Sequence, residues 1–153
     1  TSLDTNWDPQ ERWEGVGDLL PFTDVFFPNE AEACSLTGEA NPEAAANRLA
    51  QQAGTVALKR GARGALAQRG DGVVRCEGFR VQVADTVGAG DSFDAGFLYG
   101  FLNGWGLNSS LQLATACGAM STQGIGGTVA QPTLAEALNF LKENKVNLDD
   151  QLS

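Results

Sequence analysis

Short apolar runs and helical stripes of apolar residues alternate along the chain, a pattern typical of a layered α/β fold. Apolar runs bounded by turn residues predict strands at 1–5, 24–27, 55–58, 64–68 and 73–76, and Val81 and Val83 close that β-rich section. Apolar residues repeated every three or four positions predict helices at 9–20, 29–38, 41–54, 91–102, 111–122 and 134–143. Residues 147–153 are expected to be a frayed tail. We therefore expect a mostly parallel sheet flanked by helices, with a short hairpin.

Local signals support two of these helices. Asn29 precedes Glu30 and Glu32, so its side chain is placed to cap a helix whose first turn carries acidic residues. The helix predicted after residue 90 carries an aromatic stripe, expected in the core, of Phe93, Phe97 and Phe101.

Composition narrows the possible functions. With 42% hydrophobic residues among 153, the chain can bury one core, and we expect one compact domain. A net charge of -9 makes nucleic acid and anionic membranes poor partners. The absence of His removes imidazole bases and most zinc sites. Three separated Cys without a CxxC pair, and no signal-peptide or membrane-span pattern, favour a cytoplasmic protein.

The segment from Asp85 to Phe93, DTVGAGDSF, carries the chemistry. Its small residues Gly88 to Gly90 leave backbone N–H groups unshielded just before a helix, and such helix ends bind phosphate-like anions. Asp91 suits the positive helix end but would repel an anion bound there. Both features are explained if a hydroxyl lies between Asp91 and a phosphoryl group, with Asp91 as the base. A glycine turn with a capping Asp explains the spacing equally well.

DTVGAGDSF resembles the C-terminal signature of the ribokinase-like (PfkB) sugar kinases. Four further segments resemble that family in the family's order: Ser2–Asn6, Asn29–Glu32 with Leu36–Gly38, Lys59–Gly64 and Gly118–Thr128. The resemblance runs from about Ser2 to about Lys145. By that resemblance Asp91 is the catalytic base, and the anion hole is formed by Gly88, Ala89 and Gly90.

The resemblance also implies a nucleotide site and a cation site. Asn29 and Glu32 would organise phosphate and Mg²⁺-bound water, although Asn29 can also serve as a plain helix cap. The nucleotide would lie along Gly61 and Gly64, near Thr115, and Lys59 stands where the family often has a small hydroxyl residue. Asp85 with the Val87 carbonyl resembles a monovalent-cation site for K⁺, while a turn-stabilising role for Asp85 is the alternative.

The fold and function expected from this resemblance are those of the nucleotide-binding, catalytic half of a kinase that transfers phosphate from ATP, with Mg²⁺, to a sugar hydroxyl. The N-terminal half and lid that select the sugar are expected to be absent, so the isolated chain is expected to be inactive and to self-associate or to need that half. The alternatives are a kinase for a nucleoside or another small alcohol, and a non-catalytic nucleotide- or partner-binding module. The chain has no G-x-x-x-x-G-K-[ST] motif, which disfavours a P-loop enzyme.

Overall fold

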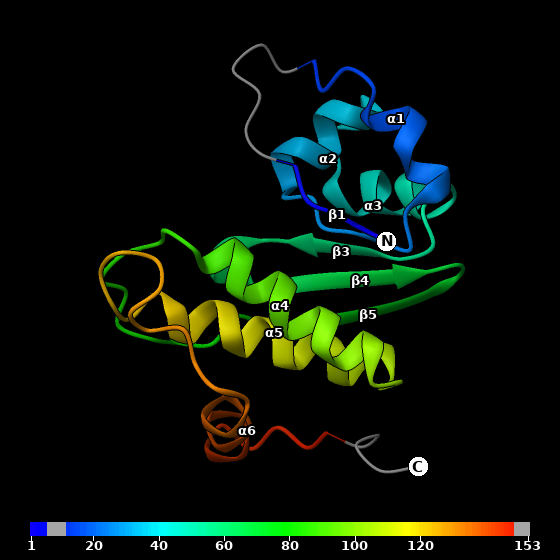
Figure 1. The fold of residues 1–153 in the computed structure, drawn as a ribbon. Helices are drawn as coiled ribbons and strands as arrows, with labels where there is room; N and C mark the ends of the chain where they lie inside the picture. Colours follow the sequence, from blue (N-terminus) through cyan, green and yellow to red (C-terminus); the bar gives the residue numbers. More distant parts are fainter. Residues whose placement is uncertain (6–11, 149–153) are drawn as a thin grey trace. The chain divides into compact units, whose positions relative to one another are not determined.

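The computed structural model describes residues 1–5 and 12–148, so Asn6 and part of the predicted tail lie outside the described residues. The chain divides into two compact units (Figure 1). Unit 1 comprises Thr1–Arg60 and Leu66–Val74, and unit 2 comprises Gly61–Ala65 and Arg75–Ser153. Each unit has a hydrophobic cluster of its own, whereas composition had suggested one core.

The five strands form one sheet in chain order: β1 (Ser2–Leu3), β2 (Val25–Phe26), β3 (Val56–Lys59), β4 (Ala65–Arg69) and β5 (Gly72–Cys76). β1 pairs with β2 in parallel, with Ser2 opposite Val25, and β2 pairs with β3 in parallel, with Phe26 opposite Val56. A turn at Gly70 and Asp71 joins β4 to β5, and a link that short produces a hairpin. All five predicted strands are confirmed, as is the α/β class.

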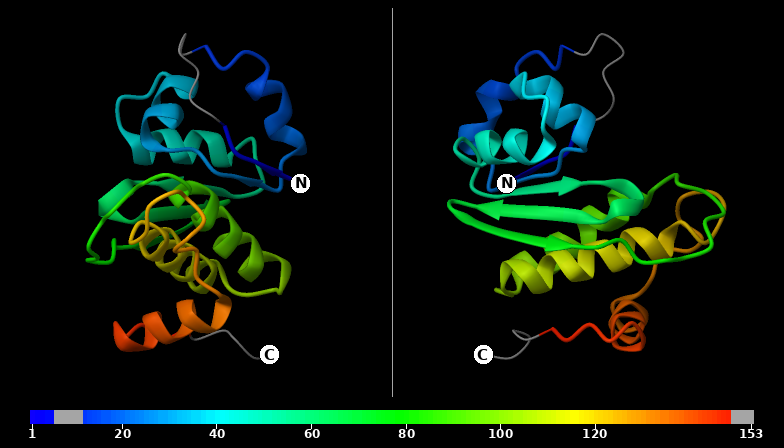
Figure 2. Two further views of the ribbon diagram at one scale, coloured as in Figure 1. Left: turned by 60° about the vertical axis from the view of Figure 1, so that its left-hand side comes forward. Right: turned by 180° about the vertical axis from the view of Figure 1, so that it is seen from behind.

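The helices of unit 1 are α1 (Val16–Leu19), α2 (Glu30–Thr37) and α3 (Pro42–Ala50), with a 3₁₀ turn at Leu20–Phe22. α2 and α3 lie beside the strands β1 to β3 (Figure 2). They cover a cluster in which Phe26, Leu49 and Leu58 are almost fully buried. Burial of these apolar side chains is the main stabilising interaction of the unit.

The helix predicted at 9–20 is confirmed at Val16–Leu19 and is wrong at 12–15. Trp13 has a φ of 39° and Gly15 a φ of 82°, and neither value fits a right-handed helix. The helix therefore begins only at Val16. Residues 9–11 of that prediction lie outside the described residues.

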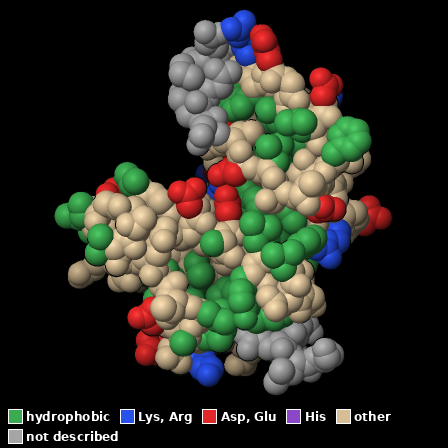
Figure 3. Space-filling view, in the orientation of Figure 1, with side chains coloured by type: hydrophobic (Ala, Val, Ile, Leu, Met, Phe, Trp, Pro, Cys, Tyr) green, Lys and Arg blue, Asp and Glu red, His purple; other side chains and the backbone are tan. Residues whose placement is uncertain are grey.

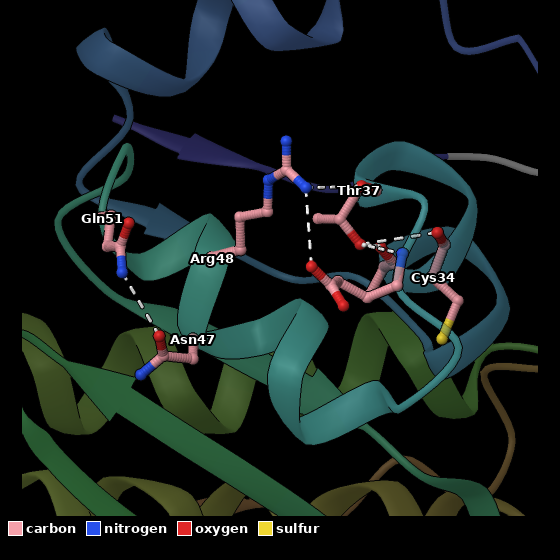
Figure 4. Close-up of polar contacts among 7 residues, drawn as sticks. Cys34, Thr37, Asn47, Arg48 and Gln51 are labelled. Carbon is pink, nitrogen blue, oxygen red and sulfur yellow. Dashed lines mark hydrogen bonds and ion pairs between the residues drawn. The ribbon is translucent and has the colours of Figure 1, made fainter.

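Polar contacts fix the end of α2 against α3 (Figure 4). The guanidinium of Arg48 donates to the Thr37 carbonyl at 3.0 Å, and it lies 3.5 Å from the Glu39 carboxylate. Gly38, with a φ of 73°, closes α2 by donating its N–H to the Cys34 carbonyl. A cation near the last carbonyls of a helix stabilises the negative helix end.

Unit 2 contains a 3₁₀ turn at Gly61–Arg63 and the helices α4 (Ala89–Leu102), α5 (Leu107–Ser121) and α6 (Leu134–Glu143). α4 and α5 run side by side (Figures 1 and 2). They approach closely because Gly96 has no side chain: a Cβ there would lie 2.9 Å from the Ala114 Cα. Phe93 and Phe97 are buried and Phe101 partly buried, which confirms the predicted core stripe.

α6 matches its predicted bounds, while α4 and α5 begin two and four residues earlier than predicted. α6 packs its buried Ala137 and Leu141 against Leu113 and Ala116 of α5. Val81 and Val83 form no strand in the described structure. None of the helices described is both long enough and apolar enough to cross a membrane.

Gly64 allows a close approach between two backbone segments, and its replacement is expected to be costly. Its φ is 89°, and a Cβ would lie 2.0 Å from the Cys76 carbonyl oxygen. Gly64→Ala should lower the free energy of unfolding by about 2–5 kcal/mol, because left-handed strain contributes roughly 1–2 kcal/mol and displacement of the backbone roughly 1–3 kcal/mol. Gly70, with a φ of 54° and open space around it, is the control. Gly70→Ala should lower the free energy of unfolding only by the left-handed strain, roughly 1–2 kcal/mol. Urea unfolding that gives equal losses for Gly64→Ala and Gly70→Ala would contradict the account.

Candidate active site

The turn that precedes α4 presents unpaired backbone donors. Gly88 caps α4 in the left-handed conformation, with φ 76° and ψ 0°. Ala89 N–H donates to the Thr86 carbonyl and Ser92 N–H to the Gly88 carbonyl. Within the described part of the chain, the N–H groups of Gly90 and Asp91 meet no acceptor. We call residues 85–91 the anion turn, because two such donors at the positive end of a 14-residue helix suit an anion.

The anion turn is held against the glycine loop, residues 122–128. The Thr122 carbonyl accepts hydrogen bonds from Ala84 N–H at 2.8 Å and from Asp85 N–H at 3.1 Å. A Cβ on Gly88 would lie 2.4 Å from the Gly127 carbonyl oxygen, so the two segments touch backbone to backbone. The conformation of the turn therefore depends on the loop.

The Asp85 carboxylate is a second link between these segments. One of its oxygens accepts from Gly126 N–H at 3.0 Å, and the other accepts from Val87 N–H at 3.1 Å. These bonds, the one from Gly126 first, hold the pKa of the Asp85 carboxyl below its usual value, because they favour the ionised form. The turn-stabilising role expected as the alternative for Asp85 is thus present in the structure.

Asp91 lies in the first turn of α4 with its side chain exposed. Beside it is a cavity of about 220 Å³ between α4, α5 and the residues before α6. Among the described residues, Asp91 is the only carboxylate that lines the cavity, and the buried hydroxyl of Ser92 at its wall finds no hydrogen-bond partner. Cys117 also lines the cavity, but burial raises its pKa to about 11, so it stays a neutral thiol. A positioned carboxylate such as that of Asp91 can serve as a general base.

Asn29 and Glu32 form a capping box at the start of α2. The Asn29 side chain accepts from Glu32 N–H at 2.9 Å, and the Glu32 carboxylate accepts from Asn29 N–H at 2.9 Å. Glu32 is only 3% exposed. Asn29 is therefore a helix cap, which is the alternative role that the sequence suggested for it. A role for Asn29 and Glu32 in phosphate binding stays a prediction.

The start of the predicted nucleotide loop carries two tethered cations. Lys59 is the last residue of β3, and its Nζ lies 2.8 Å from an Asp4 carboxylate oxygen. Arg60 lies 3.1 Å from the Glu30 carboxylate and 3.6 Å from that of Glu43. Asp4, which sequence reasoning gave no ligand role, therefore holds the side chain of a predicted site residue.

The other predicted nucleotide residues are in unit 2. Gly61, with a φ of 58°, has open space where a Cβ would be, whereas Gly64 is needed for a close backbone approach. Thr115 is only 6% exposed, and its hydroxyl donates to the Leu111 carbonyl at 2.8 Å. The structure thus gathers Asp85, Val87 and 88–91 in one turn and leaves Thr115 in the interior of unit 2.

Two features of unit 2 escaped sequence reasoning. The segment Gly118–Thr128 was matched to the family, but the contact of its glycine loop with the anion turn was not predicted. The adjacent Gly126 and Gly127 were the available signal. Asp94, one turn after Asp91, was given no role, yet it is only 8% exposed.

Comparison with known proteins relates this chain to the carbohydrate kinases. The model of the pfkB family carbohydrate kinases matches residues 2–134. The 2-dehydro-3-deoxygluconokinase of Bacillus subtilis is 39% identical over 132 residues, which are 85% of this chain and 41% of the relative. A ribokinase of Haemophilus influenzae is 34% identical over 131 residues, 82% of this chain and 43% of the relative.

Solved structures agree in fold. A putative ribokinase II of E. coli in complex with ATP and Mg²⁺ superposes with a TM-score of 0.85 at 26% identity, over 93% of this chain and 48% of that one. A fructokinase of Vibrio cholerae with fructose, ADP and potassium ion bound gives a TM-score of 0.79 at 29% identity, over 92% of this chain and 49% of that one. This chain therefore spans about half the length of these relatives or somewhat less.

Asp85→Asn tests the link between the anion turn and the glycine loop. The amide has one acceptor oxygen, so its NH₂ group would face one of the two N–H donors, and the melting temperature at neutral pH should fall. The folded-state pKa of Asp85 is lowered, so the stabilisation is present above the unfolded value of about 3.9 and is lost as pH falls through the folded value.

The melting temperatures of parent and variant should therefore differ most at neutral pH and converge below about pH 3.9. Asp71→Asn, in the exposed turn between β4 and β5, is the control and should change little. If the difference in melting temperature between the parent and Asp85→Asn stays constant from neutral to acid pH, the hydrogen bonds of the carboxylate do not stabilise the fold.

Proposed function

Since this chain belongs to the pfkB family of carbohydrate kinases, we propose that it serves the transfer of the γ-phosphoryl group of ATP to a sugar hydroxyl. The observation that carries the proposal is the anion turn, which places two unpaired N–H groups beside an exposed carboxylate, Asp91. Anion-binding donors next to a base are the two functions that phosphoryl transfer to a hydroxyl requires.

The proposed step divides the chemistry between these groups. The sugar hydroxyl gives its proton to Asp91 while its oxygen bonds to the γ-phosphorus of ATP. The bond from that phosphorus to the β–γ bridging oxygen breaks, and ADP leaves. The N–H groups of Gly90 and Asp91, with the positive end of α4, stabilise charge on the transferring phosphoryl oxygens.

We propose the predicted nucleotide residues as contacts of ATP. Asn29, Glu32 and Lys59 would serve its phosphates, and Gly61 and Gly64 would lie along it. The support is their match to family motifs and, for Lys59, its cationic side chain at a strand end. Thr115 is left out of the proposed site, because its buried hydroxyl already donates to a main-chain carbonyl.

Two cations belong to the proposal. The described residues hold no group of three or more Cys, Asp or Glu placed to bind a metal, so Mg²⁺ would be ligated mainly by ATP phosphates and water, with Glu32 orienting such a water. Bound Mg²⁺ would neutralise charge on the β- and γ-phosphates. K⁺ would bind at Asp85 and the Val87 carbonyl, hard oxygen donors that fit the ion. A similar structure, the fructokinase of Vibrio cholerae, has potassium ion bound, which supports a role for K⁺.

A nucleoside is the second candidate acceptor. An aminoimidazole riboside kinase of Salmonella enterica superposes with a TM-score of 0.78 at 27% identity, and an adenosine kinase of Sinorhizobium meliloti with 0.75 at 25%. The sugar kinases named above share 34% to 39% identity over most of this chain, which favours a sugar. The non-catalytic alternative is disfavoured by the retained Asp91, because a module that only bound nucleotide would need no base.

Exposed apolar side chains support contact with another polypeptide. Hydrophobic side chains, green in Figure 3, form visible patches between acidic ones. In unit 2 the large apolar residues that are more than two-thirds exposed are Leu102, Ile125 and Val129. Such patches favour association, either of two copies or with the remaining half of a kinase.

We expect the purified chain to self-associate through exposed apolar side chains such as Leu102. The mass measured by light scattering should increase with protein concentration. Leu102→Glu should make this increase in mass smaller. Glu143→Gln, on the exposed last turn of α6, should leave the increase unchanged. A strict monomer at every concentration would refute the self-association proposed here.

Asp91→Asn tests the assignment of the base in a polypeptide that joins this chain to the substrate-binding part of a pfkB kinase. The amide keeps the size of the side chain but cannot accept the hydroxyl proton, so turnover should fall by roughly 10²–10⁴-fold. ATP affinity should hold or rise, since a negative charge beside the anion turn is removed. Sugar phosphorylation and thermal unfolding are measured on the same samples.

Asp18→Asn is the matched control, because Asp18 is also an exposed aspartate in the first turn of a helix, α1. Its turnover should stay within a few-fold of the parent. If Asp91 is only a capping residue, Asp91→Asn loses about 1 kcal/mol of stability at most and keeps its turnover. Parental turnover by folded Asp91→Asn protein would therefore overturn the assignment.

A further inference from the structure

An ion pair connects the ends of two strands that are not neighbours in the sheet. Asp4 follows the last residue of β1 and Lys59 ends β3, while β2 lies between these strands. The Lys59 ammonium donates to the Asp4 carboxylate at 2.8 Å. In an open α/β sheet, ligands bind beyond the carboxyl ends of the parallel strands, and this pair lies at that edge.

The surroundings of Lys59 limit where its ammonium can go. The side chain is 17% exposed, so most of its length is covered by protein. Its backbone N–H donates to the Pro28 carbonyl at 2.8 Å, and the residue forms a parallel bridge with Asn29. A lysine normally loses much side-chain freedom when its ammonium becomes fixed. Here the bond to Asp4 imposes that restriction without a nucleotide.

The neighbouring cation has a different arrangement. Arg60 lies between the carboxylates of Glu30 on α2 and Glu43 on α3, at 3.1 and 3.6 Å. It therefore ties the start of the loop to the first turns of two helices. Asp4, by contrast, stands at the end of a strand, and its carboxylate is 35% exposed.

We propose that Asp4 is a positioning residue, which holds the Lys59 ammonium in place to bind ATP phosphate where the family often has a hydroxyl. The inference rests on the proposed kinase function. The chain carries 10 basic and 19 acidic residues, so an incoming polyanion meets general repulsion, and a fixed cation offsets it locally. An ammonium has three N–H donors, so the bond to Asp4 does not exclude a bond to a phosphate oxygen.

Lys59 should contribute to binding of the phosphates and not of the adenosine part of the nucleotide. Lys59→Met should weaken ATP and ADP binding by about tenfold or more, the size expected for loss of a charge-assisted hydrogen bond, and leave adenosine binding unchanged. Asp4→Asn should weaken ATP binding by about threefold or more, because the ammonium loses its tether. Lys59→Arg keeps the charge and should restore part of the affinity.

The double variant distinguishes positioning from simple charge. Once Lys59 is replaced by Met, Asp4 is only a negative charge near the phosphates. In that background Asp4→Asn should leave ATP affinity unchanged or raise it. The sign of the Asp4→Asn effect should therefore depend on Lys59, which is the signature of a residue that acts through another.

The experiment is calorimetric titration of the whole chain and its variants with ATP, ADP and adenosine in the presence of Mg²⁺, with thermal unfolding measured alongside. Lys142→Met and Asp18→Asn are the controls for charge, since both positions are exposed and lie outside the proposed site. The proposal predicts that ATP binds and that Asp4→Asn weakens ATP binding only when Lys59 is present. Adenosine binding should be the same in all variants.

Three results would overturn it. Tighter ATP binding by Asp4→Asn with Lys59 present would mean that Asp4 neutralises the lysine rather than positioning it. Equal losses for ATP and adenosine would mean that the pair only maintains the fold. Unchanged ATP binding by Lys59→Met would reject the inference and leave the proposed function intact, whereas absence of ATP binding by the parent would contradict the proposed function itself.

Discussion

The backbone contact between Gly88 and the Gly127 carbonyl is the constraint on which the candidate site depends. No side chain fits between these segments, so the anion turn is shaped by main-chain atoms and by the Asp85 carboxylate that accepts one N–H from each side. Gly88 forms the left-handed cap of α4 at this contact. Gly90 and Asp91 lie in the first turn of the helix, and their N–H groups have no acceptor among the described residues. The chemistry assigned to the helix end therefore depends on a loop more than thirty residues further along the chain.

The surplus of acidic groups, 19 against 10 basic ones, is a second constraint on a chain proposed to bind a nucleotide. In unit 2, backbone N–H groups and a helix end attract phosphate without adding a mobile charge. In unit 1, Lys59 is a cation that is restrained by Asp4. Glu32 and Arg60 are meanwhile held in capping and ion-pair contacts. Most charged side chains near the strand ends thus stabilise local structure, and few are left to bind ligand.

The sequence predicted the strands, the helices α2 and α3 and the helical part of unit 2, because apolar spacing, caps and turn residues all agreed there. It failed near Trp13, whose positive φ interrupts a pattern that is periodic in sequence. Family resemblance found the anion turn and Asp91, but local sequence cannot show which distant backbone the turn touches. The pairing of Asp4 with Lys59 and the burial of Thr115 are likewise products of tertiary packing, which a linear pattern does not encode.

The central claim is that the anion turn binds the phosphates of ATP. The amide resonances of Gly90 and Asp91 report on it directly, because these N–H groups have no acceptor among the described residues and would gain one from a phosphate. In a nuclear magnetic resonance titration of the whole chain with ATP and Mg²⁺, both should move downfield, and adenosine should leave them in place. Binding of ATP that shifts other amides but leaves these two unmoved would contradict the account.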